Sequence, residues 1–361
     1  MMQLMVHEFQ DRIRDAAARH LPLAIVGQGS KRFYGEAPRG EPLDTRAFSG
    51  VSSYEPTELV VTAKAGTPIA ELEAALAAQG QCLAFEPPRF GGQGTVGGMV
   101  ASGLSGPSRA SCGAVRDHVL GLSLLNGRAE LLNFGGTVMK NVAGYDVSRL
   151  MAGAMGVLGL ILEVSLKVVP LPVCQATLRF EMTQAQALQA LNRWGGLALP
   201  LHASAHSAGV LSLRLAGAQA AVRAAVQFLG GEAMSESEAS QFWAGLRDHD
   251  HAFFKSPMQD GAALWRLSVP STAPELKLAG EQLVEWGGAQ RWLLTSQSTD
   301  ANAVRQAASA AGGHATLFRA QEKRGPVFTP LSAPLQRIHQ QLKQAFDPAG
   351  IFNPGRLYPE F

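Results

Sequence analysis

A stretch of twelve residues, Thr95–Gly106, reads Thr-Val-Gly-Gly-Met-Val-Ala-Ser-Gly-Leu-Ser-Gly and carries almost no bulky polar side chain. Glycine lets a backbone approach a ligand closely, so that several N–H groups can converge on one anion, and small hydroxyls add further donors. We therefore interpret the stretch as a loop that cradles a phosphate group. It lacks the Lys-Ser/Thr ending of a P-loop and the Gly-x-Gly-x-x-Gly order of a Rossmann turn. A flavin diphosphate held outside a Rossmann fold is the ligand that fits best, and a flexible linker is the alternative.

A second short glycine-rich segment, Gly27-Gln28-Gly29-Ser30-Lys31, follows a predicted strand at 22–26. It could face the same phosphate, with Lys31 balancing the negative charge. The alternative is an ordinary Gly-Ser turn. A buried diphosphate needs hydrogen-bond donors on both sides. The presence of two such segments therefore favours phosphate binding more strongly than either segment would alone.

Three further motifs have functional and structural interpretations that both stay open. Lys140, Asn141 and Tyr145 follow a glycine pair and could face the flavin edge where charge gathers on reduction, or form a surface turn. The glycine-spaced run 153–161 could bring the main chain of Ile161 to an adenine edge, or serve close backbone packing. His249-Asp250-His251 resembles an acid–base cluster, but its spacing favours an exposed helix end.

Composition limits the classes of protein to consider. The 361 residues predict about two domains, and 46% apolar residues with a net charge of +2 give nucleic-acid binding little support. Cys82, Cys112 and Cys174 are far apart, which argues against bound metal or iron–sulfur clusters and fits a reducing cytoplasm. The amphipathic residues 1–20 are unlike a signal peptide, and the apolar run 150–162 is too short to cross a bilayer.

The first half of the chain predicts an α+β domain of short strands without regular βαβ alternation. A helix is expected over 67–78, with Thr67 as its N-cap and Pro68 as its first residue, and a hairpin at Asn126-Gly127. The expected strands are 22–26, 59–64, 119–125, 129–134 and 160–169.

Beyond Pro170-Leu-Pro172 the pattern changes to alternating strands and helices. The predicted strands are 176–182, 208–215, 263–269, 291–295 and 315–318, and the predicted helices are 184–194, 219–229, 238–247, 275–286, 303–311 and 334–346. Two halves of this kind predict an antiparallel sheet of ferredoxin-like repeats with helices on one face. We expect three parts: a cofactor-binding domain at 1–170, an α+β cap or substrate domain at 171–325, and a helix and tail at 326–361 that return to the first domain.

The order of these motifs resembles the vanillyl-alcohol-oxidase/PCMH-type FAD-binding family. The resemblance is carried by Glu55–Glu58, Thr95–Gly98, Gly113-x-x-Arg116-Asp117, Gly144–Asp146, Gly156-x-Leu158-Gly159 and Asn353–Arg356. Within that family, Lys140–Asp146, Leu264–Ser268 and Gly312–Thr316 are similar to the FAD-binding subunits of bacterial glycolate oxidases.

The resemblance implies a two-lobed PCMH-type domain with an α+β cap, and a bound FAD. The FAD is expected to be non-covalent, because Gln28 and Ser30 stand where some members tether it through a histidine. The cofactor contacts that it implies are Gly27, Gly29, Ser30, Lys31, Thr95, Val96, Gly97, Gly98, Ser102, Gly103, Gly113, Asp117, Gly159 and Ile161.

The implied activity is the oxidation of glycolate to glyoxylate, within a complex that also holds a second flavin subunit and an iron–sulfur subunit. Such a complex is cytoplasmic and meets the inner membrane only peripherally. The His-x-Gly-Asp and Asn-x-His patterns of the catalytic 2-hydroxy-acid members do not occur in this chain. Lys140, Tyr145, Arg266 and Arg319 are weak catalytic candidates, the two arginines as carboxylate ligands. A self-sufficient FAD-dependent dehydrogenase and a flavin-free assembly subunit remain alternatives.

Overall fold

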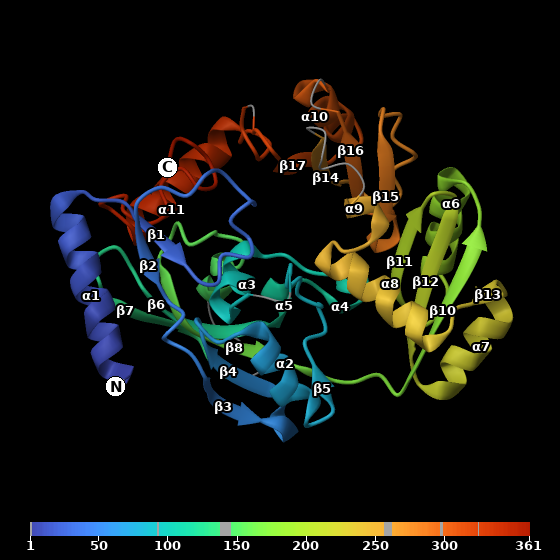
Figure 1. The fold of residues 1–361 in the computed structure, drawn as a ribbon, viewed down its shortest axis with the longest axis horizontal. Helices are drawn as coiled ribbons and strands as arrows, with labels where there is room; N and C mark the ends of the chain where they lie inside the picture. Colours follow the sequence, from blue (N-terminus) through green and yellow to red (C-terminus); the bar gives the residue numbers. More distant parts are fainter. Residues whose placement is uncertain (1, 92–93, 138–145, 256–261, 297–298, 324) are drawn as a thin grey trace.

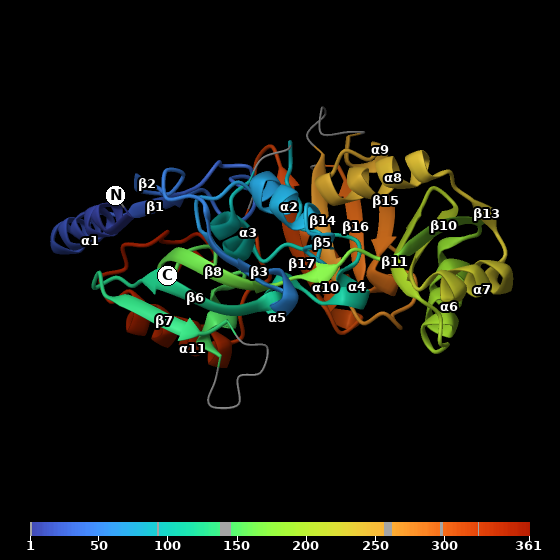
Figure 2. The same ribbon diagram turned by 90° about the horizontal axis from the view of Figure 1, so that it is seen from below.

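The computed structural model describes residues 2–361 except 92–93, 138–145, 256–261, 297–298 and 324. Two β-sheets lie side by side, with short helices between them (Figures 1 and 2). Lys140 and Tyr145 belong to a segment outside the described residues. In the described part, no helix is long and apolar enough to cross a membrane.

The first sheet is antiparallel and has the order β3-β4-β8-β6-β7. Four of its strands lie at the expected positions: β4 (Val60–Lys64), β8 (Leu160–Lys167), β6 (Val119–Leu125) and β7 (Leu131–Gly135). The fifth, β3 (Val51–Glu55), was not predicted. The hairpin predicted at Asn126-Gly127 joins β6 to β7. A smaller pair, β5 (Gln81–Cys82) with β9 (Val169–Pro170), lies at the exit from this half.

Helices cover both faces of this sheet. In Figure 2, α2 (Ile69–Ala77) and α3 (Val96–Ser102) lie on one side, and α11 (Ala333–Phe346) lies on the other. Leu72 of α2 and Met99 of α3 are buried in the core of the sheet, and Phe346 of α11 meets Phe134 at a ring separation of 6.2 Å. The C-terminal helix therefore belongs to the first half of the molecule in space.

The N-terminal segment forms a separate edge of this half. α1 (Met2–Arg19) buries Phe9 and Ile13 in a core cluster that Leu125 and Leu160 of the sheet also join. A parallel pair follows, formed by β1 (Leu23–Val26) and β2 (Glu41–Asp44). Phe352 of the C-terminal tail forms an isolated parallel bridge with Leu23, so the two ends of the chain meet at β1.

The expectation of a loop at Thr95–Gly106 is wrong, because most of it is the helix α3. Thr95 caps this helix by accepting a hydrogen bond from the Gly98 N–H at 3.2 Å. Gly97 permits close packing, since a Cβ there would lie 2.7 Å from the Ala65 Cβ. The prediction of Thr67 as the N-cap of α2 is also wrong, because the N-cap is Pro68. The Thr67 hydroxyl forms hydrogen bonds with the N–H and the carbonyl of Gly50.

The second sheet has the order β13-β10-β12-β11-β15-β16-β14-β17 and is antiparallel throughout. Each half has the strand order 4-1-3-2 of a ferredoxin-like unit, as predicted, and β11 pairs with β15 to join them. The strands are β10 (Cys174–Glu181), β11 (Leu201–Ser207), β12 (Val210–Gly217), β13 (Glu232–Ala233), β14 (Ala263–Ser268), β15 (Glu281–Glu285), β16 (Gln290–Thr295) and β17 (His314–Ala320).

The remaining helices are short, and most match their predicted positions. They are α4 (Arg109–Cys112), α5 (Val115–His118), α6 (Gln184–Gly195), α7 (Gln219–Leu229), α8 (Glu236–Asp248), α9 (Ala252–Lys255) and α10 (Ala301–Ala310). The helix predicted at 275–286 is wrong. Leu283 and Val284 lie instead in β15, where pairing with β11 and β16 overrides helical periodicity. The strand β11 was not predicted, and the turn at Ala208-Gly209 moves the start of β12 to Val210.

The two halves are held together by polar contacts. Glu86 forms an ion pair with Arg214 at 2.7 Å, and the Trp286 indole donates to the Gly106 carbonyl at 3.0 Å. Lys323 donates to the carbonyls of Phe33 and Gly35. The domain boundaries at 170 and 325 stay predictions.

A buried ion pair organises the C-terminal tail. Lys343 donates to Asp347 at 2.7 Å and to the carbonyls of Val157 and Phe352. Asp347 accepts from the backbone N–H groups of Ile351 and Phe352. Burial lowers the pKa of Lys343, and Asp347 opposes that shift. The pair therefore fixes the path of the chain from α11 back to β1.

We expect Asp347→Ala to lower the free energy of unfolding by about 3–5 kcal/mol, because it leaves the buried Lys343 ammonium without its counterion. Asp15→Ala removes an exposed pair with Arg19 and should cost less than about 1 kcal/mol. Urea denaturation of both variants measures the difference. Equal, small losses would show that the buried pair does not stabilise the tail.

Candidate functional site

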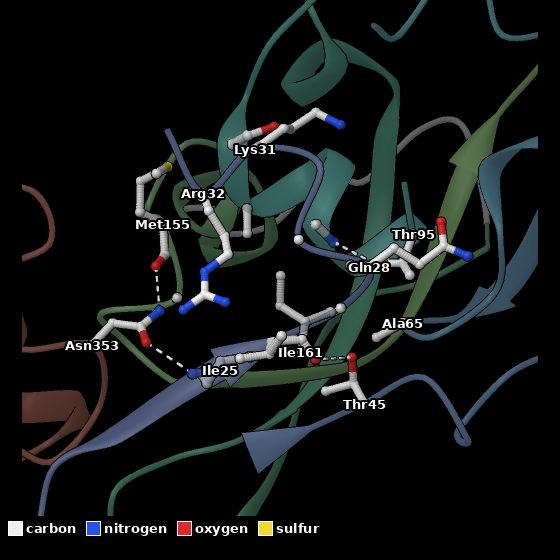
Figure 3. A pocket seen from close by; sticks show the side chains of 18 of the residues that line it. Ile25, Gln28, Lys31, Arg32, Thr45, Ala65, Thr95, Met155, Ile161 and Asn353 are labelled. Carbon is white, nitrogen blue, oxygen red and sulfur yellow. Dashed lines mark hydrogen bonds between the residues drawn. The ribbon is translucent and has the colours of Figure 1, made fainter. Parts of the chain in front are cut away.

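The principal cavity lies where the loop after β1 faces α3, the glycine-rich segment before β8 and the C-terminal tail (Figure 3). It holds about 950 Å³ of empty space, open solvent at its mouth included. Its lining residues are Ile25, Val26, Gly27, Gln28, Gly29, Ser30, Lys31, Arg32, Pro38, Thr45, Ala65, Thr95, Gly97, Gly98, Ala101, Ser102, Met155, Gly156, Gly159, Ile161, Asn353 and Arg356.

Most of the predicted cofactor residues come together in this lining. They are Gly27, Gly29, Ser30, Lys31, Thr95, Gly97, Gly98, Ser102, Gly159 and Ile161. Four other predicted residues, Val96, Gly103, Gly113 and Asp117, do not line the cavity. Val96 packs in the core, Gly103 ends α3 against Gly153, and Asp117 caps α5 through the Ala114 N–H beside Gly113. The binding role of every residue in the set stays a prediction.

The loop after β1 supplies free donors to the cavity. Within the described part of the chain, none of the backbone N–H groups from Gly27 to Lys31 donates to a protein acceptor. Gly29 has a φ of +74°, a conformation that lets neighbouring N–H groups in a turn point toward one anion. Such an arrangement binds an anion well, and a diphosphate would satisfy these donors.

The glycines of α3 contribute space rather than donors. The N–H of Val96 donates to the Thr67 carbonyl, and that of Gly97 donates to the Ala65 carbonyl. We expected both glycine segments to offer their N–H groups, and for α3 this is wrong. A Cβ at Gly27 would lie 2.5 Å from the Thr95 Oγ1, so only glycine lets the loop approach α3 this closely.

Side chains lock the two segments together. Gln28, which was not predicted as a site residue, accepts from the Gly94 N–H at 2.6 Å. Lys31 lies with its Nζ 3.4 Å from the Ser30 hydroxyl and 5.5 Å from the centre of the Phe90 ring. Burial lowers the pKa of Lys31 to about 8, partly offset by Asp248. An anion in the cavity would restore the charge of this lysine.

The C-terminal tail closes one wall of the cavity (Figure 3). Asn353 accepts from the Ile25 N–H at 2.9 Å and donates to the Met155 carbonyl at 2.6 Å, which ties β1 to the glycine-rich segment. Arg356 donates to the carbonyls of Lys31, Arg32 and Glu36. Both belong to the motif that suggested the family, but nothing in the sequence showed that they line the cavity.

The cavity fits an elongated ligand with an anionic centre. The free N–H groups and Lys31 form its polar part, and Ile25, Ala65 and Ile161 give an apolar surface of the kind that an adenine ring packs against. These features match an FAD-like cofactor by charge and by the presence of an apolar wall.

The predicted carboxylate ligands Arg266 and Arg319, and the histidine His249, do not line this cavity. Arg266 on β14 and Arg319 on β17 point among aromatic rings at the junction of the two halves. His249 was expected at an exposed helix end, and this is wrong. Its ring is stacked on Phe254 at 3.8 Å, and its Nδ1 is buried, because β16 and β17 pack over the end of α8.

Comparisons with known proteins agree with this geometry. Residues 6–149 match a family model described as an FAD binding domain. The chain is 47% identical over 350 residues to glycolate oxidase subunit GlcE of Escherichia coli (strain K12), an alignment that covers 97% of this chain and 96% of that protein. It is 28% identical over 172 residues to glycolate oxidase subunit GlcD of Bacillus subtilis (strain 168), covering 46% and 36%. A solved alkyldihydroxyacetonephosphate synthase has a similar fold, with a TM-score of 0.65, 14% identity, and coverage of 96% and 73%.

The lowered pKa of Lys31 gives a pH dependence. Its ammonium is charged below about pH 8 and neutral above it, so the affinity for a diphosphate should fall by up to about tenfold between pH 7 and pH 9. Titrating nucleotide-free protein with ADP measures this, since the charge of ADP is nearly constant over that range. Lys31→Met should bind more weakly and lose the dependence, whereas Lys277→Met, at an exposed site, should keep it. An unchanged dependence in Lys31→Met would contradict the assignment.

Proposed function

The chain belongs to the glycolate oxidase subunit GlcE family, and from this premise we propose that it is the FAD-binding subunit of a complex that oxidises glycolate to glyoxylate. Near-complete coverage of both chains at 47% identity supports the proposal. FAD is the cofactor to which the matched domain at residues 6–149 corresponds. The protein is thus an FAD-dependent oxidoreductase of the class that acts on the CH–OH group of a 2-hydroxy acid.

The observation that carries the proposal is the row of free N–H groups from Gly27 to Lys31, facing a glycine-lined helix across the principal cavity. These groups and Lys31 would hold the FAD diphosphate, and the apolar wall at Ile161 would hold the adenine. Gly98 lines the cavity, and a Cβ there would press on the Thr95 Oγ1 at 3.2 Å. Bound FAD would supply the two-electron acceptor for the substrate.

We propose that the FAD is bound without a covalent link. Among the described residues that line the cavity, none is a histidine, cysteine or tyrosine, the side chains best suited to form such a link. The loop positions Gln28 and Ser30 support the same conclusion.

The subunit works with partners in this proposal. A second flavin subunit and an iron–sulfur subunit would accept the electrons, and the complex would be cytoplasmic and meet the inner membrane only peripherally. The name of the Escherichia coli relative, a subunit of glycolate oxidase, supports the presence of partner subunits. We also propose the division at 1–170, 171–325 and 326–361, which the two sheets and the returning tail support.

The flavin test uses Gly98→Glu. A carboxylate at this exposed position would fill the floor of the cavity and repel the diphosphate, so the purified variant should lose at least about nine-tenths of its flavin absorbance. Gly195→Glu makes the same change at an exposed glycine where a Cβ meets no atom within 4 Å, and it should retain its flavin. Flavin retained in both variants would show that FAD is bound elsewhere.

Substrate chemistry is tested by adding glycolate to the purified complex without oxygen. The flavin bands should bleach as electrons enter. If the isolated chain also bleaches, it turns over alone, and the proposed dependence on partners is wrong. If the complex does not bleach, glycolate is not the substrate.

A further inference from the structure

A second cavity lies at the junction of the two halves and takes no part in the proposed FAD site. It is small, with about 310 Å³ of empty space, open solvent included. Both halves build its walls. Phe90 and Leu104 come from the first half, and Arg266, Trp292 and Phe318 come from the eight-stranded sheet.

Two arginines at this junction have no acidic partner in the described part of the chain. Arg266, which lines the cavity, lies over the rings of Tyr34 and Phe318 at 5.8 and 6.0 Å. Arg319 lies over Phe33 at 4.2 Å. Neighbouring arginines differ in this respect, since Arg214 pairs with Glu86 and Arg247 pairs with Asp248.

The lack of a counterion has a physical cost. Burial lowers the pKa of Arg319, which reports that its guanidinium has lost solvation. Aromatic faces compensate a cation only in part. A carboxylate would supply the missing charge and can take two parallel hydrogen bonds from one guanidinium. The two guanidinium groups therefore offer positive charge that an added carboxylate would neutralise.

A histidine beside the arginines offers a different kind of contact. His249 lines the same cavity, and its buried Nδ1 has no hydrogen-bond partner in the described part of the chain. Burial and the charges of Arg319 and Arg266 hold the pKa of His249 well below its usual value, so the ring is neutral. A neutral imidazole accepts a hydrogen bond at one nitrogen and donates at the other, which suits a hydroxyl group.

Glu285 also lines this cavity. Its carboxyl group accepts from the Trp292 indole at 2.6 Å and from the Gln290 amide at 3.1 Å, so both side chains are fixed in place. The cavity is also next to the proposed FAD site. Phe90 lines it, and the Nζ of Lys31, which lines the FAD cavity, lies 5.5 Å from the centre of that ring.

We propose that this second cavity binds a small 2-hydroxy carboxylate, with Arg266 and Arg319 on the carboxylate and His249 on the hydroxyl group. The identification of that ligand as glycolate rests on the proposed function. The small volume and the aromatic walls favour a ligand with a short carbon chain over a large one.

The proposal is tested by glycolate binding to the purified, flavin-loaded chain, followed by calorimetry and by tryptophan fluorescence, because Trp292 lies in the cavity wall. Wild type should bind glycolate saturably. Arg266→Gln and Arg319→Gln should each raise the Kd at least tenfold. Arg223→Gln, at an exposed site on α7, should bind like wild type.

His249→Gln separates a contact to the hydroxyl group from a general structural effect. Acetate has the carboxylate of glycolate but no hydroxyl group. The variant should therefore lose affinity for glycolate several-fold more than for acetate. Equal losses for both ligands would mean that His249 only supports the cavity wall, and this part of the proposal would be wrong.

Flavin absorbance of each protein keeps the two proposals apart. If wild type holds FAD and the arginine variants bind glycolate as well as wild type does, the carboxylate site is wrong and the FAD site stands. If wild type lacks FAD yet binds glycolate in an arginine-dependent way, the carboxylate site stands and the proposed function fails.

A measurement on wild type covers the case in which a variant does not fold. Phenylglyoxal modifies accessible arginines, and peptide mass spectrometry locates the products. Glycolate should slow the modification of Arg266 and Arg319 and leave that of Arg223 unchanged. Equal modification with and without glycolate would overturn the proposal.

Discussion

The return of the C-terminal tail to β1 is the contact on which the cavity depends. The buried Lys343–Asp347 pair fixes the turn after α11, and Asn353 then bonds both Ile25 and the carbonyl of Met155. Arg356 occupies the carbonyls of the loop after β1. Because the tail takes the acceptors of this loop and not its donors, the N–H groups from Gly27 to Lys31, which line the cavity, stay without a partner among the described residues. The first and last segments of the chain thus form one wall together.

Hydrophobic patterns in the sequence predicted those strands and helices whose structure follows from nearby residues. The alternating and apolar runs of the first sheet, and the paired ferredoxin-like order of the second, are visible without coordinates. The wrong predictions concern segments whose structure depends on contacts with residues far away in the sequence. Residues 281–285 read as helical, yet they form the strand that joins the two halves of the second sheet. Glycines made 95–106 look like a loop, but Gly97 is needed so that a helix can approach Ala65.

The same limit applies to the site. Most of the predicted residues lie in the lining, since Gly27–Lys31 and Thr95–Gly98 carry recognisable motifs. The sequence did not show that Gly27–Lys31 supplies free N–H donors, whereas the glycines of α3 supply only space for close packing. It also missed the environment of His249, because the stack on Phe254 and the cover from Trp292 and Phe318 depend on strands packed over the end of α8. Spacing along the chain contains no information of that kind.

The two cavities differ in what holds them open. The FAD cavity is built from residues of the first half and the tail, so it needs no contribution from the eight-stranded sheet. The second cavity has walls from both halves, which Glu86–Arg214, the Trp286 indole and Lys323 link by polar contacts. In the two proposals, backbone donors would hold the diphosphate in the first cavity, and side-chain cations would hold a carboxylate in the second. On that basis we expect small movements between the halves to affect substrate binding more than cofactor binding.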